Sequence, residues 1–351
     1  MSLRVLVTGH NGYIGSVLAP YLKRGGCDVH GVDSFYFGQD CSFCPDETDV
    51  SSLRKDIRDL TAKDLDGFDA VVHLAALCND PLGNLQPEWT FAINYEASVR
   101  LAELAKAAGV RRFLMASSCS MHGKSTEVRV TEETPVNPLT AYGLSKIQAE
   151  TAIAKLADDR FSPTFLRNGT VFGVSPRLRI DIVLNNLVAW AFTTGRVRIL
   201  SAGTQWRPVI HVEDVSAAFL AGLSAPLEVV HNQVFHVGSN QENYTIKNMA
   251  EIVKCCMPGC TVEYLNDASA DQRTYIADFS KIERMMPEFR PRWSLEAGTR
   301  QLLDAYQRYG LKEDDLTGAR YVRINRINSI VQAGAIDETF RWRDRLRHYD
   351  P

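Results

Sequence analysis

The stretch VTGHNGYIG, Val7–Gly15, stands almost at the start of the chain and decides the fold that the sequence predicts. Its three glycines follow an apolar run typical of a buried strand and precede a helical pattern. Glycines at such a junction can simply close a tight turn. Between a strand and a helix, however, this spacing also lets free backbone N–H groups and the positive end of the helix dipole face a phosphate. The stretch is therefore a candidate dinucleotide cradle.

A carboxylate further along the chain supports the cradle. Asp33 ends the apolar stretch 28–32, at the distance from the glycines that is typical of a ribose-binding acid. In such a site Gly9 permits the turn, Gly12 lets the backbone approach phosphate, and Gly15 lets the helix pack closely. An acid at this place binds the ribose 2′-hydroxyl and repels a 2′-phosphate, which favours NAD over NADP. The alternative for Asp33 is a turn residue at a strand end.

Strand and helix patterns alternate along the first half of the chain. Strands are expected at 3–7, 28–32, 68–74, 112–117 and from 165, and helices at 13–22, 94–108 and 140–156. This alternation predicts an α/β fold, a Rossmann-type doubly wound parallel sheet with helices on both faces. We expect an NAD-binding domain over 1–169, to which later strands return, and a smaller mixed α/β substrate domain over 170–351.

Composition narrows the function classes. The chain has 351 residues, of which 45% are hydrophobic and 23% charged, with a formal net charge of −3. These values are ordinary for a globular protein and give no overall attraction to nucleic acid or to an anionic membrane. No apolar run approaches the ~20 residues that a spanning helix needs. We expect a cytoplasmic protein with neither nucleic acid nor membrane as a partner.

Two further patterns are expected to be structural. Cys41 and Cys44 have the spacing of half a zinc site, but the other clustered cysteines, at 255, 256 and 260, are remote and irregularly spaced. No metal is therefore expected. The last stretch, from Arg320, is rich in arginine with acidic residues interspersed, which is typical of a solvated helix face.

A tyrosine and a lysine four residues apart carry the candidate chemistry. Tyr142 and Lys146 lie one helical turn apart on the same face of the helix expected at 140–156. A free phenol has a pKa of about 10 and is a poor base at neutral pH. A neighbouring ammonium and a positive nicotinamide ring would favour the phenolate, so that Tyr142 could accept a proton. An incidental spacing is the alternative, which the nucleotide cradle in the same unit disfavours.

These two motifs together resemble a known family. Thr8-Gly9-x-x-Gly12-x-x-Gly15 with Tyr142-x-x-x-Lys146 is similar to the extended short-chain dehydrogenases/reductases, specifically the nucleotide-sugar epimerases and dehydratases. The resemblance runs from the first strand to about residue 280. The sequence NGYIGS, at residues 11–16, resembles the nucleotide-binding fingerprint of the UDP-galactose 4-epimerases.

The resemblance implies a set of site residues. The catalytic group would be Ser118, Tyr142 and Lys146. The cofactor group would be Gly9, Asn11, Gly12, Tyr13, Ile14, Gly15, Asp33, Asp56, Ile57, Leu74, Ala75, Ala76, Asn94, Ser117, Tyr142 and Lys146, around NAD. The substrate group would be Asn79, Ser118, Asn186, Arg207 and Arg273, around a UDP-, GDP- or dTDP-linked sugar. Asp80 is expected either to contact the sugar or to cap a turn.

Departures from the family pattern favour one activity within it. Dehydratases and decarboxylating members have acids directly after the catalytic Ser or Thr, where this chain has Cys119 and Ser120. Without them β-elimination lacks its obvious acid and base, which favours an epimerase that oxidises the sugar transiently to a keto form. The alternatives are a net oxidoreductase (a keto-sugar reductase or sugar dehydrogenase), a dehydratase, or a non-catalytic NAD sensor. Cys119 and His122 are expected to be structural, and the resemblance implies a homodimer, because the family pairs through the helices that correspond to 94–108 and 140–156.

Overall fold

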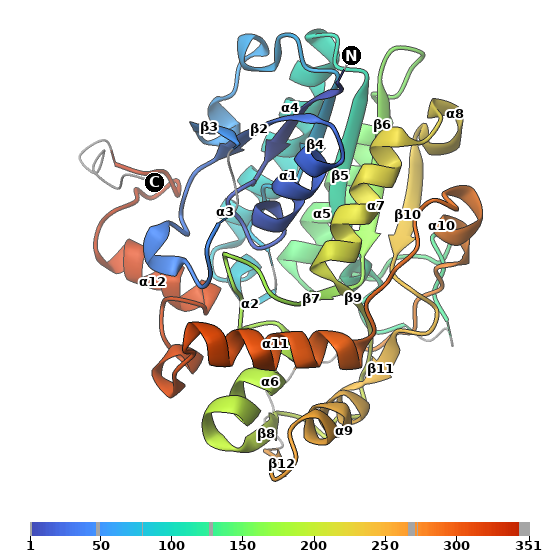
Figure 1. Ribbon diagram of the computed structural model, residues 1–351. Helices are drawn as coiled ribbons and strands as arrows, with labels where there is room; N and C mark the ends of the chain where they lie inside the picture. The colour runs from blue at the N-terminus through green and yellow to red at the C-terminus, as the bar shows by residue number, and fades with distance from the viewer. Residues whose placement is uncertain are drawn as a thin grey trace.

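A seven-stranded parallel sheet forms the centre of the computed structural model (Figure 1). The structure describes residues 2–46, 50–78, 80–125, 129–265, 271 and 273–343. In spatial order the strands are β10 (Gln233–Val237), β6 (Ser162–Asn168), β5 (Arg112–Ser118), β4 (Ala70–His73), β1 (Arg4–Thr8), β2 (Asp28–Asp33) and β3 (Ser51–Arg54). The strand order reverses between β1 and β4, the place where doubly wound sheets bind their ligands. The Rossmann-type fold expected from the sequence is thereby confirmed.

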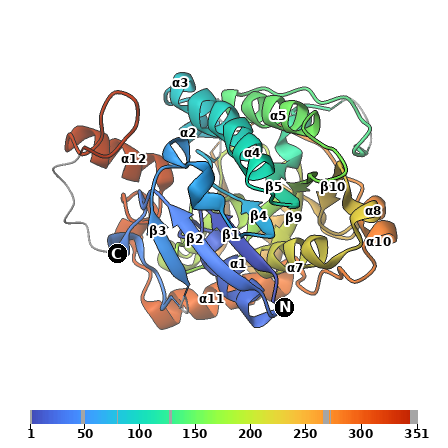
Figure 2. The same cartoon turned by 90° about the horizontal axis from the view of Figure 1, so that it is seen from above.

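Helices cover both faces of this sheet (Figure 2). On one face lie α1 (Gly15–Arg24) and α7 (Val212–Ser224), and on the other lie α4 (Ala97–Ala107) and α5 (Ala141–Ala154). Each face buries its own apolar core: Leu18 and Phe219 belong to the first, and Leu101 and Ile153 to the second. The sheet is thus buried on both sides, which is why its strands read as continuous apolar runs.

Two helix predictions differ from the structure at their first residues. Helix α1 begins at Gly15 and not at Tyr13, because 13–14 still belong to the turn that leaves β1. The helix expected at 94–108 begins as a π-helical segment, Phe91–Glu96, which continues into α4. π-helical turns are rare and are frequent at functional sites. Here the segment lies beside the first turns of α5.

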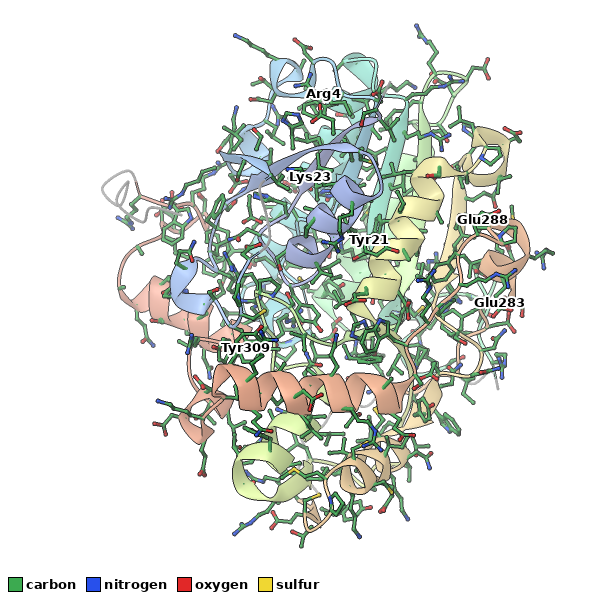
Figure 3. The ribbon with its side chains drawn as sticks, viewed as in Figure 1. Arg4, Tyr21, Lys23, Glu283, Glu288 and Tyr309 are labelled. Carbon is green, nitrogen blue, oxygen red and sulfur yellow. The ribbon has the colours of Figure 1, made fainter. Side chains whose placement is uncertain are left out.

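A smaller lobe lies beyond the carboxyl edge of the sheet (Figure 1). It holds the strands β7 (Thr170–Phe172), β8 (Arg196–Ile199), β9 (Trp206–His211), β11 (Asn243–Thr245) and β12 (Thr261–Tyr264), and the helices α6 (Val183–Thr194), α9 (Ile246–Cys256) and α11 (Leu295–Tyr309). Its core includes Leu187, Val197 and Tyr306. Figure 3 shows Tyr309, at the end of α11, in this lobe, whereas Arg4 lies at the opposite, amino edge of the sheet.

The second half of the chain also contributes to the first unit, by which we mean the seven-stranded sheet with the helices on its two faces. Strand β10 pairs with β6 in the large sheet, and α7 packs against α1. The second half of the chain after residue 169 is therefore not confined to the smaller lobe. The domain boundary between residues 169 and 170 stays a prediction. The short helices are α2 (Asp80–Gly83), α3 (Pro87–Thr90), α8 (Leu227–Val230) and α10 (Ser280–Met285).

As far as residue 343, the arginine-rich end of the chain is not the solvated helix face that was expected; residues 344–351, which include most of the arginine-rich stretch 340–348, lie outside the described residues. The described part forms α12 (Arg323–Gln332), which lies next to α2 (Figures 1 and 2), and then an irregular segment. Arg323 and Arg326 are buried, as is Phe340. The expectation fails because these arginines turn toward the first unit and bind its backbone and acids. Within the described ranges, no helix has the length and apolarity needed to cross a membrane.

Candidate active site

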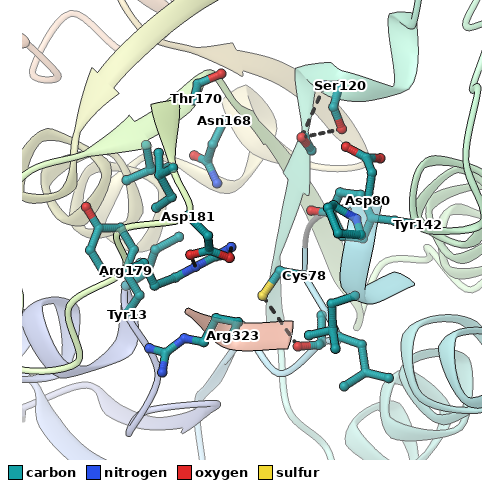
Figure 4. A pocket seen from close by; sticks show the side chains of 18 of the residues that line it. Tyr13, Cys78, Asp80, Ser120, Tyr142, Asn168, Thr170, Arg179, Asp181 and Arg323 are labelled. Carbon is teal, nitrogen blue, oxygen red and sulfur yellow. Dashed lines mark hydrogen bonds and ion pairs between the residues drawn. The ribbon is translucent and has the colours of Figure 1, made fainter. Parts of the chain in front are cut away.

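One large pocket opens at the carboxyl ends of β1, β4, β5 and β6 (Figure 4). Its volume is about 1040 Å³, above the range of roughly 300–1000 Å³ that is usual for a pocket holding one small ligand. It is lined by every residue that the sequence assigned to cofactor or substrate, apart from Asn11, Asn79 and Asn94. Asn79 lies outside the described residues. Segments that are remote in sequence therefore meet at one cavity.

The glycine turn is too tight for side chains. Gly9 has a φ of +75°, and a Cβ there would lie 2.7 Å from the backbone nitrogen of Ala75. A Cβ on Gly15 would lie 2.1 Å from the carbonyl oxygen of Gly9. The backbone nitrogen of Gly9 also donates to the carbonyl of Val32, 2.8 Å away, which ties the turn to β2. Backbone alone thus forms this wall of the pocket, at the N-terminus of α1, where an anion is stabilised.

Asp33 is held rigidly at the end of β2. Its Oδ2 accepts from the backbone nitrogen of Asn11 at 3.0 Å, and its Oδ1 accepts from that of Phe35 at 2.7 Å. Each carboxylate oxygen keeps a further lone pair for a ligand hydroxyl. The carboxylate faces the pocket together with Asp56 and Ile57, and Asp56 is also paired with Arg58 at 2.6 Å.

The two predicted asparagines that do not line the pocket hold its loops. The side-chain nitrogen of Asn11 donates to the carbonyl of Phe37 at 3.1 Å. The amide of Asn94, fully buried in the π-helical segment, accepts from the backbone nitrogen of Leu77 at 2.8 Å and donates to its carbonyl at 2.9 Å. It also donates to Ser145 at 3.3 Å. Asn94 therefore links the loop after β4 to α5 and acts as a positioning residue.

Ser118, Tyr142 and Lys146 meet at the end of β5. Tyr142 lies in the first turn of α5, whose first residues are capped by Thr140 through the backbone nitrogen of Gly143. The Tyr142 hydroxyl shares a side-chain hydrogen bond with Ser118. Lys146, one turn further, is 2% exposed and donates from Nζ to the carbonyl of Ala116 at 3.0 Å. The three side chains expected to react are thus brought together.

Burial sets the protonation of this trio. It raises the pKa of Tyr142, and the nearby Cys78 and Asp80 raise it further, while the bond from Ser118 opposes them. The phenol is therefore protonated at neutral pH. Burial also lowers the pKa of Lys146 to about 8, so its ammonium is easily lost above that pH. A cationic ring entering the pocket beside Tyr142 would shift the phenol toward its ionised form.

Charged side chains dominate the other side of the pocket. Arg207 pairs with Asp271 at 2.9 Å, Asp271 pairs with Arg273, and Arg273 Nη1 pairs with Asp80 at 2.7 Å. We call these four residues the charge ladder. Asp80 also accepts from the hydroxyl of Thr140 at 2.6 Å, so it connects the ladder to the first turn of α5. Sequence reasoning left Asp80 open and did not consider Asp271, because no local pattern brings residues 80, 207 and 271 together.

The two carboxylates of the charge ladder neutralise its two arginines. Burial opposes ionisation of Asp271, but the hydrogen bond from Arg273 and the charges of Arg273 and Arg207 outweigh it, and its pKa lies well below the usual range. Asn186, also assigned to the substrate, lines the pocket from α6 and donates to the carbonyl of Ile180 at 2.9 Å. A ligand anion could replace Asp271 between the two arginines.

Of the two departures after Ser118, Ser120 lines the pocket and accepts a hydrogen bond from the Ser118 hydroxyl at 2.8 Å, whereas Cys119 points away from the pocket, as does His122. Cys119 is fully buried, and its Sγ donates to the carbonyl of Arg167 at 3.0 Å. His122 contacts His236 through Nε2 at 3.0 Å, and burial lowers its pKa to about 4. All eight cysteines are free thiols. In the part of the chain that the structure describes, no cluster of three His, Cys, Asp or Glu side chains could hold a metal.

Comparisons with known proteins show the family of the chain. A model of the NAD dependent epimerase/dehydratase family matches residues 5–238. The UDP-glucose 4-epimerase of Corynebacterium glutamicum is 27% identical over 267 residues, which are 72% of this chain and 80% of that protein. UDP-glucuronic acid decarboxylase 1 of Arabidopsis thaliana is 26% identical over 329 residues, 90% of this chain and 72% of that protein.

A solved structure extends the likeness to three dimensions. MoeE5 in complex with UDP-glucuronic acid and NAD is 29% identical, with a TM-score of 0.75 over 87% of this chain and 99% of its own. The resemblance found in the sequence motifs is therefore confirmed. The chain belongs to the NAD-dependent epimerase/dehydratase family and is an NAD-dependent enzyme.

Proposed function

We propose that this enzyme interconverts epimers of a nucleotide sugar by oxidising one sugar carbon to a ketone and reducing it again from the other face. One observation carries the proposal: the glycine turn and the trio of Ser118, Tyr142 and Lys146 line the same pocket. That pocket, of about 1040 Å³, has room for a dinucleotide and for a second nucleotide beside it.

The residues present fit NAD. Gly9 and Gly15 leave no space for a side chain, so the backbone can approach a diphosphate, and Asp33 offers two oriented oxygens to a ribose. Leu74, Ala75 and Ala76 would form the wall beside it, and Lys146 would hold the nicotinamide ribose. When bound, NAD accepts a hydride from the sugar and later returns it.

The chain itself handles the proton. Ser118 orients the reacting hydroxyl, and Tyr142 takes the proton of that hydroxyl as the carbon loses its hydride. The same proton returns from Tyr142 when the ketone is reduced, so no net proton or electron is exchanged with solvent. Lys146 supports the phenolate by its charge, since its Nζ lies buried one helical turn from the phenol.

The charge ladder is suited to the substrate diphosphate. Arg207 and Arg273 present two guanidinium groups that already grip a common anion, Asp271. Guanidinium groups bind phosphate oxygens in a fixed fork geometry. Asp80, beside Tyr142, would face the sugar and not the diphosphate. The proposed substrate is a UDP-, GDP- or dTDP-linked sugar.

A panel of UDP-, GDP- and dTDP-sugars tests the activity. The purified protein is incubated with each, new isomers are sought by NMR, and NADH is followed by its absorbance. We expect one substrate to give an epimer with no net NADH. One NADH formed per turnover would instead show a net oxidoreductase, and an unsaturated or deoxygenated product would show a dehydratase. No conversion of any sugar would support a non-catalytic role.

We further propose a cytoplasmic homodimer. The support is the resemblance, which implies pairing through α4 and α5, together with Leu144, an exposed apolar side chain in the first turn of α5. Light scattering after size-exclusion chromatography tests the assembly: a mass near twice 39.2 kDa is expected, and a monomer would contradict it. Cell fractionation tests the location.

A further inference from the structure

Arg323 is a buried cation that the proposed chemistry does not use. It is the first residue of α12, it is 3% exposed, and it lines the pocket. Its Nη2 donates to the carbonyl of Arg177 at 2.8 Å, while its Nη1 is buried without a hydrogen-bond partner. A buried charge with an unmet donor is costly unless an anion satisfies it.

The surroundings of Arg323 are positive. Arg179 lies on the same side of the pocket (Figure 4), and the acid near it, Asp181, is already bound to Arg179 by two hydrogen bonds of 3.0 and 2.9 Å. Burial and the charge of Arg179 lower the pKa of Arg323 to about 10. Two guanidinium groups in one buried part of the pocket, with a single carboxylate near them, leave one positive charge that a ligand can neutralise.

Contacts place this corner beside the glycine turn. The guanidinium of Arg323 lies 3.8 Å from the ring centroid of Phe37. The carbonyl of Phe37 accepts from Asn11, which stands between Gly9 and Gly12. The charge ladder, proposed for the substrate diphosphate, begins at Asp80 and Arg273 near Tyr142 instead. The contact with the glycine turn through Phe37 and Asn11 favours the diphosphate of the dinucleotide as the anion beside Arg323.

The segment that follows Arg323 is fixed to the loop after Asp33. The hydroxyl of Tyr36 donates to the carbonyl of Phe340, and Nε1 of Trp342 donates to that of Ser34, both at 2.6 Å. Arg326 Nε donates to the carbonyl of Tyr36 at 3.1 Å. The Tyr36 ring also stacks on Trp342, with centroids 5.4 Å apart. Ser34 and Tyr36 line the pocket, so this segment braces the adenosine side of the site.

We propose that Arg323 binds the diphosphate of NAD, and that the C-terminal segment 323–342 thereby completes the cofactor site that the glycine turn begins. The segment would both supply the charge and hold the loop at 34–37 in place, which slows release of the cofactor. This inference needs the NAD dependence of the family but not the proposed epimerisation, because it concerns binding alone.

Nucleotide binding by Arg323→Met tests the proposal. Methionine keeps an apolar stem over Phe37 and removes the charge. Calorimetry on protein freed of nucleotide measures the affinities for NAD, ADP, adenosine and UDP. Separately, the NAD that stays bound through purification is released by acid and quantified. We expect NAD and ADP to bind about 10- to 100-fold more weakly, as for a lost charge-assisted hydrogen bond. Adenosine and UDP should be unaffected. Arg320→Met is the matched control, because Arg320 is exposed, donates to the carbonyl of Ser42 and lies outside the pocket.

Each other outcome contradicts the proposal. Unchanged NAD affinity would mean that Arg323 only packs against Phe37. Weaker UDP binding with unchanged NAD binding would assign the arginine to the substrate, and an equal loss for adenosine would show a distorted loop. Without nucleotide, Arg323→Met should unfold no earlier than the wild type, and added NAD should stabilise it less. If Arg323→Met does not fold, Arg323→Gln, which can still donate to the carbonyl of Arg177, carries the same expectations.

Discussion

The two sides of the pocket are built in opposite ways. On the cofactor side, the glycine turn Gly9–Gly15 presents backbone, and its shape follows from residues a few positions apart. On the substrate side, the charge ladder presents side chains, and its ion pairs join residues from distant parts of the chain. In the proposed roles, the first side would recognise what every dinucleotide shares, whereas the second could change its ligand through single substitutions. One side of the cavity thus has a fixed backbone shape, and the other side has side chains that can vary the specificity.

Tyr142, where the two sides meet, should give the largest effect. Tyr142→Phe removes the proton acceptor, and we expect turnover of the sugar found in the panel to fall by about 10²- to 10⁴-fold. NAD content and the unfolding midpoint in urea should not change, because the ring still packs. Tyr21→Phe on α1, far from the pocket, is the control and should keep full activity. Full activity of Tyr142→Phe would refute the assigned trio.

Gly15→Ala breaks the cofactor side by shape alone. The added Cβ would overlap the carbonyl oxygen of Gly9, at 2.1 Å; the helix backbone fixes the Cβ and the oxygen is itself a backbone atom, so neither can move aside freely. We expect the free energy of unfolding to fall by about 3 kcal/mol and NAD to be lost on purification. Gly38→Ala is the control, since Gly38 has a φ of −76° and its Cβ would meet nothing closer than 3.5 Å. Full NAD content in the Gly15→Ala variant would show that the turn is not the cradle.

Arg273→Met breaks the substrate side by charge. It leaves Asp80 with Thr140 and Asp271 with Arg207, and it removes one of two guanidinium groups offered to a diphosphate. The KM for the nucleotide sugar should rise about 10- to 100-fold, and NAD affinity should stay constant. Arg300→Met, which breaks an exposed pair with Glu296 on α11, should change neither. A parallel loss of NAD affinity would mean that the two sides are not separate.

Lys146 gives a smaller, pH-dependent effect on stability. Its pKa is about 8 in the folded protein and about 10.4 in an unfolded chain, so between these values the unfolded state binds more protons. Stability contributed by this residue must therefore rise with pH across that window. Relative to Lys146→Met, the wild type should gain about 2 kcal/mol between about pH 7.5 and pH 9.5, measured by urea unfolding. The exposed Lys63→Met should give no such change, and a flat difference for Lys146 would mean that it stays charged throughout.

The features that could be predicted from the sequence are those whose residues lie close together along the chain. Gly9–Gly15, Asp33 and the pair Tyr142 and Lys146 are local patterns, and the parallel sheet was predicted from the local alternation of strand and helix patterns. Strand β3 was missed because Ser51–Arg54 is exposed and has no apolar alternation. The π-helical turn at Phe91–Glu96 has no sequence signature; Asn94 was expected to bind the cofactor, and the structure places it outside the pocket lining, bonded to Leu77, which lines the pocket.

The rest of the site depends on packing that no local pattern encodes. The partner of Asp80 is nearly two hundred residues away, and only the folded chain shows that it is Arg273. The arginines near the C-terminus were misread because charge in a short window says nothing about burial. Arg323 and Arg326 are buried because the segment turns back onto Ser34–Phe37, a tertiary contact and not a property of α12.

The charge ladder has a consequence for how a ligand enters. Asp271 pairs with both arginines, so in the proposed substrate site the binding of a diphosphate would exchange one anion for another. The incoming group would have to outcompete a tethered carboxylate, which weak or singly charged anions such as chloride or acetate do poorly. The ladder would thus discriminate against the common anions of its surroundings and reserve its arginines for a ligand that can bridge both of them.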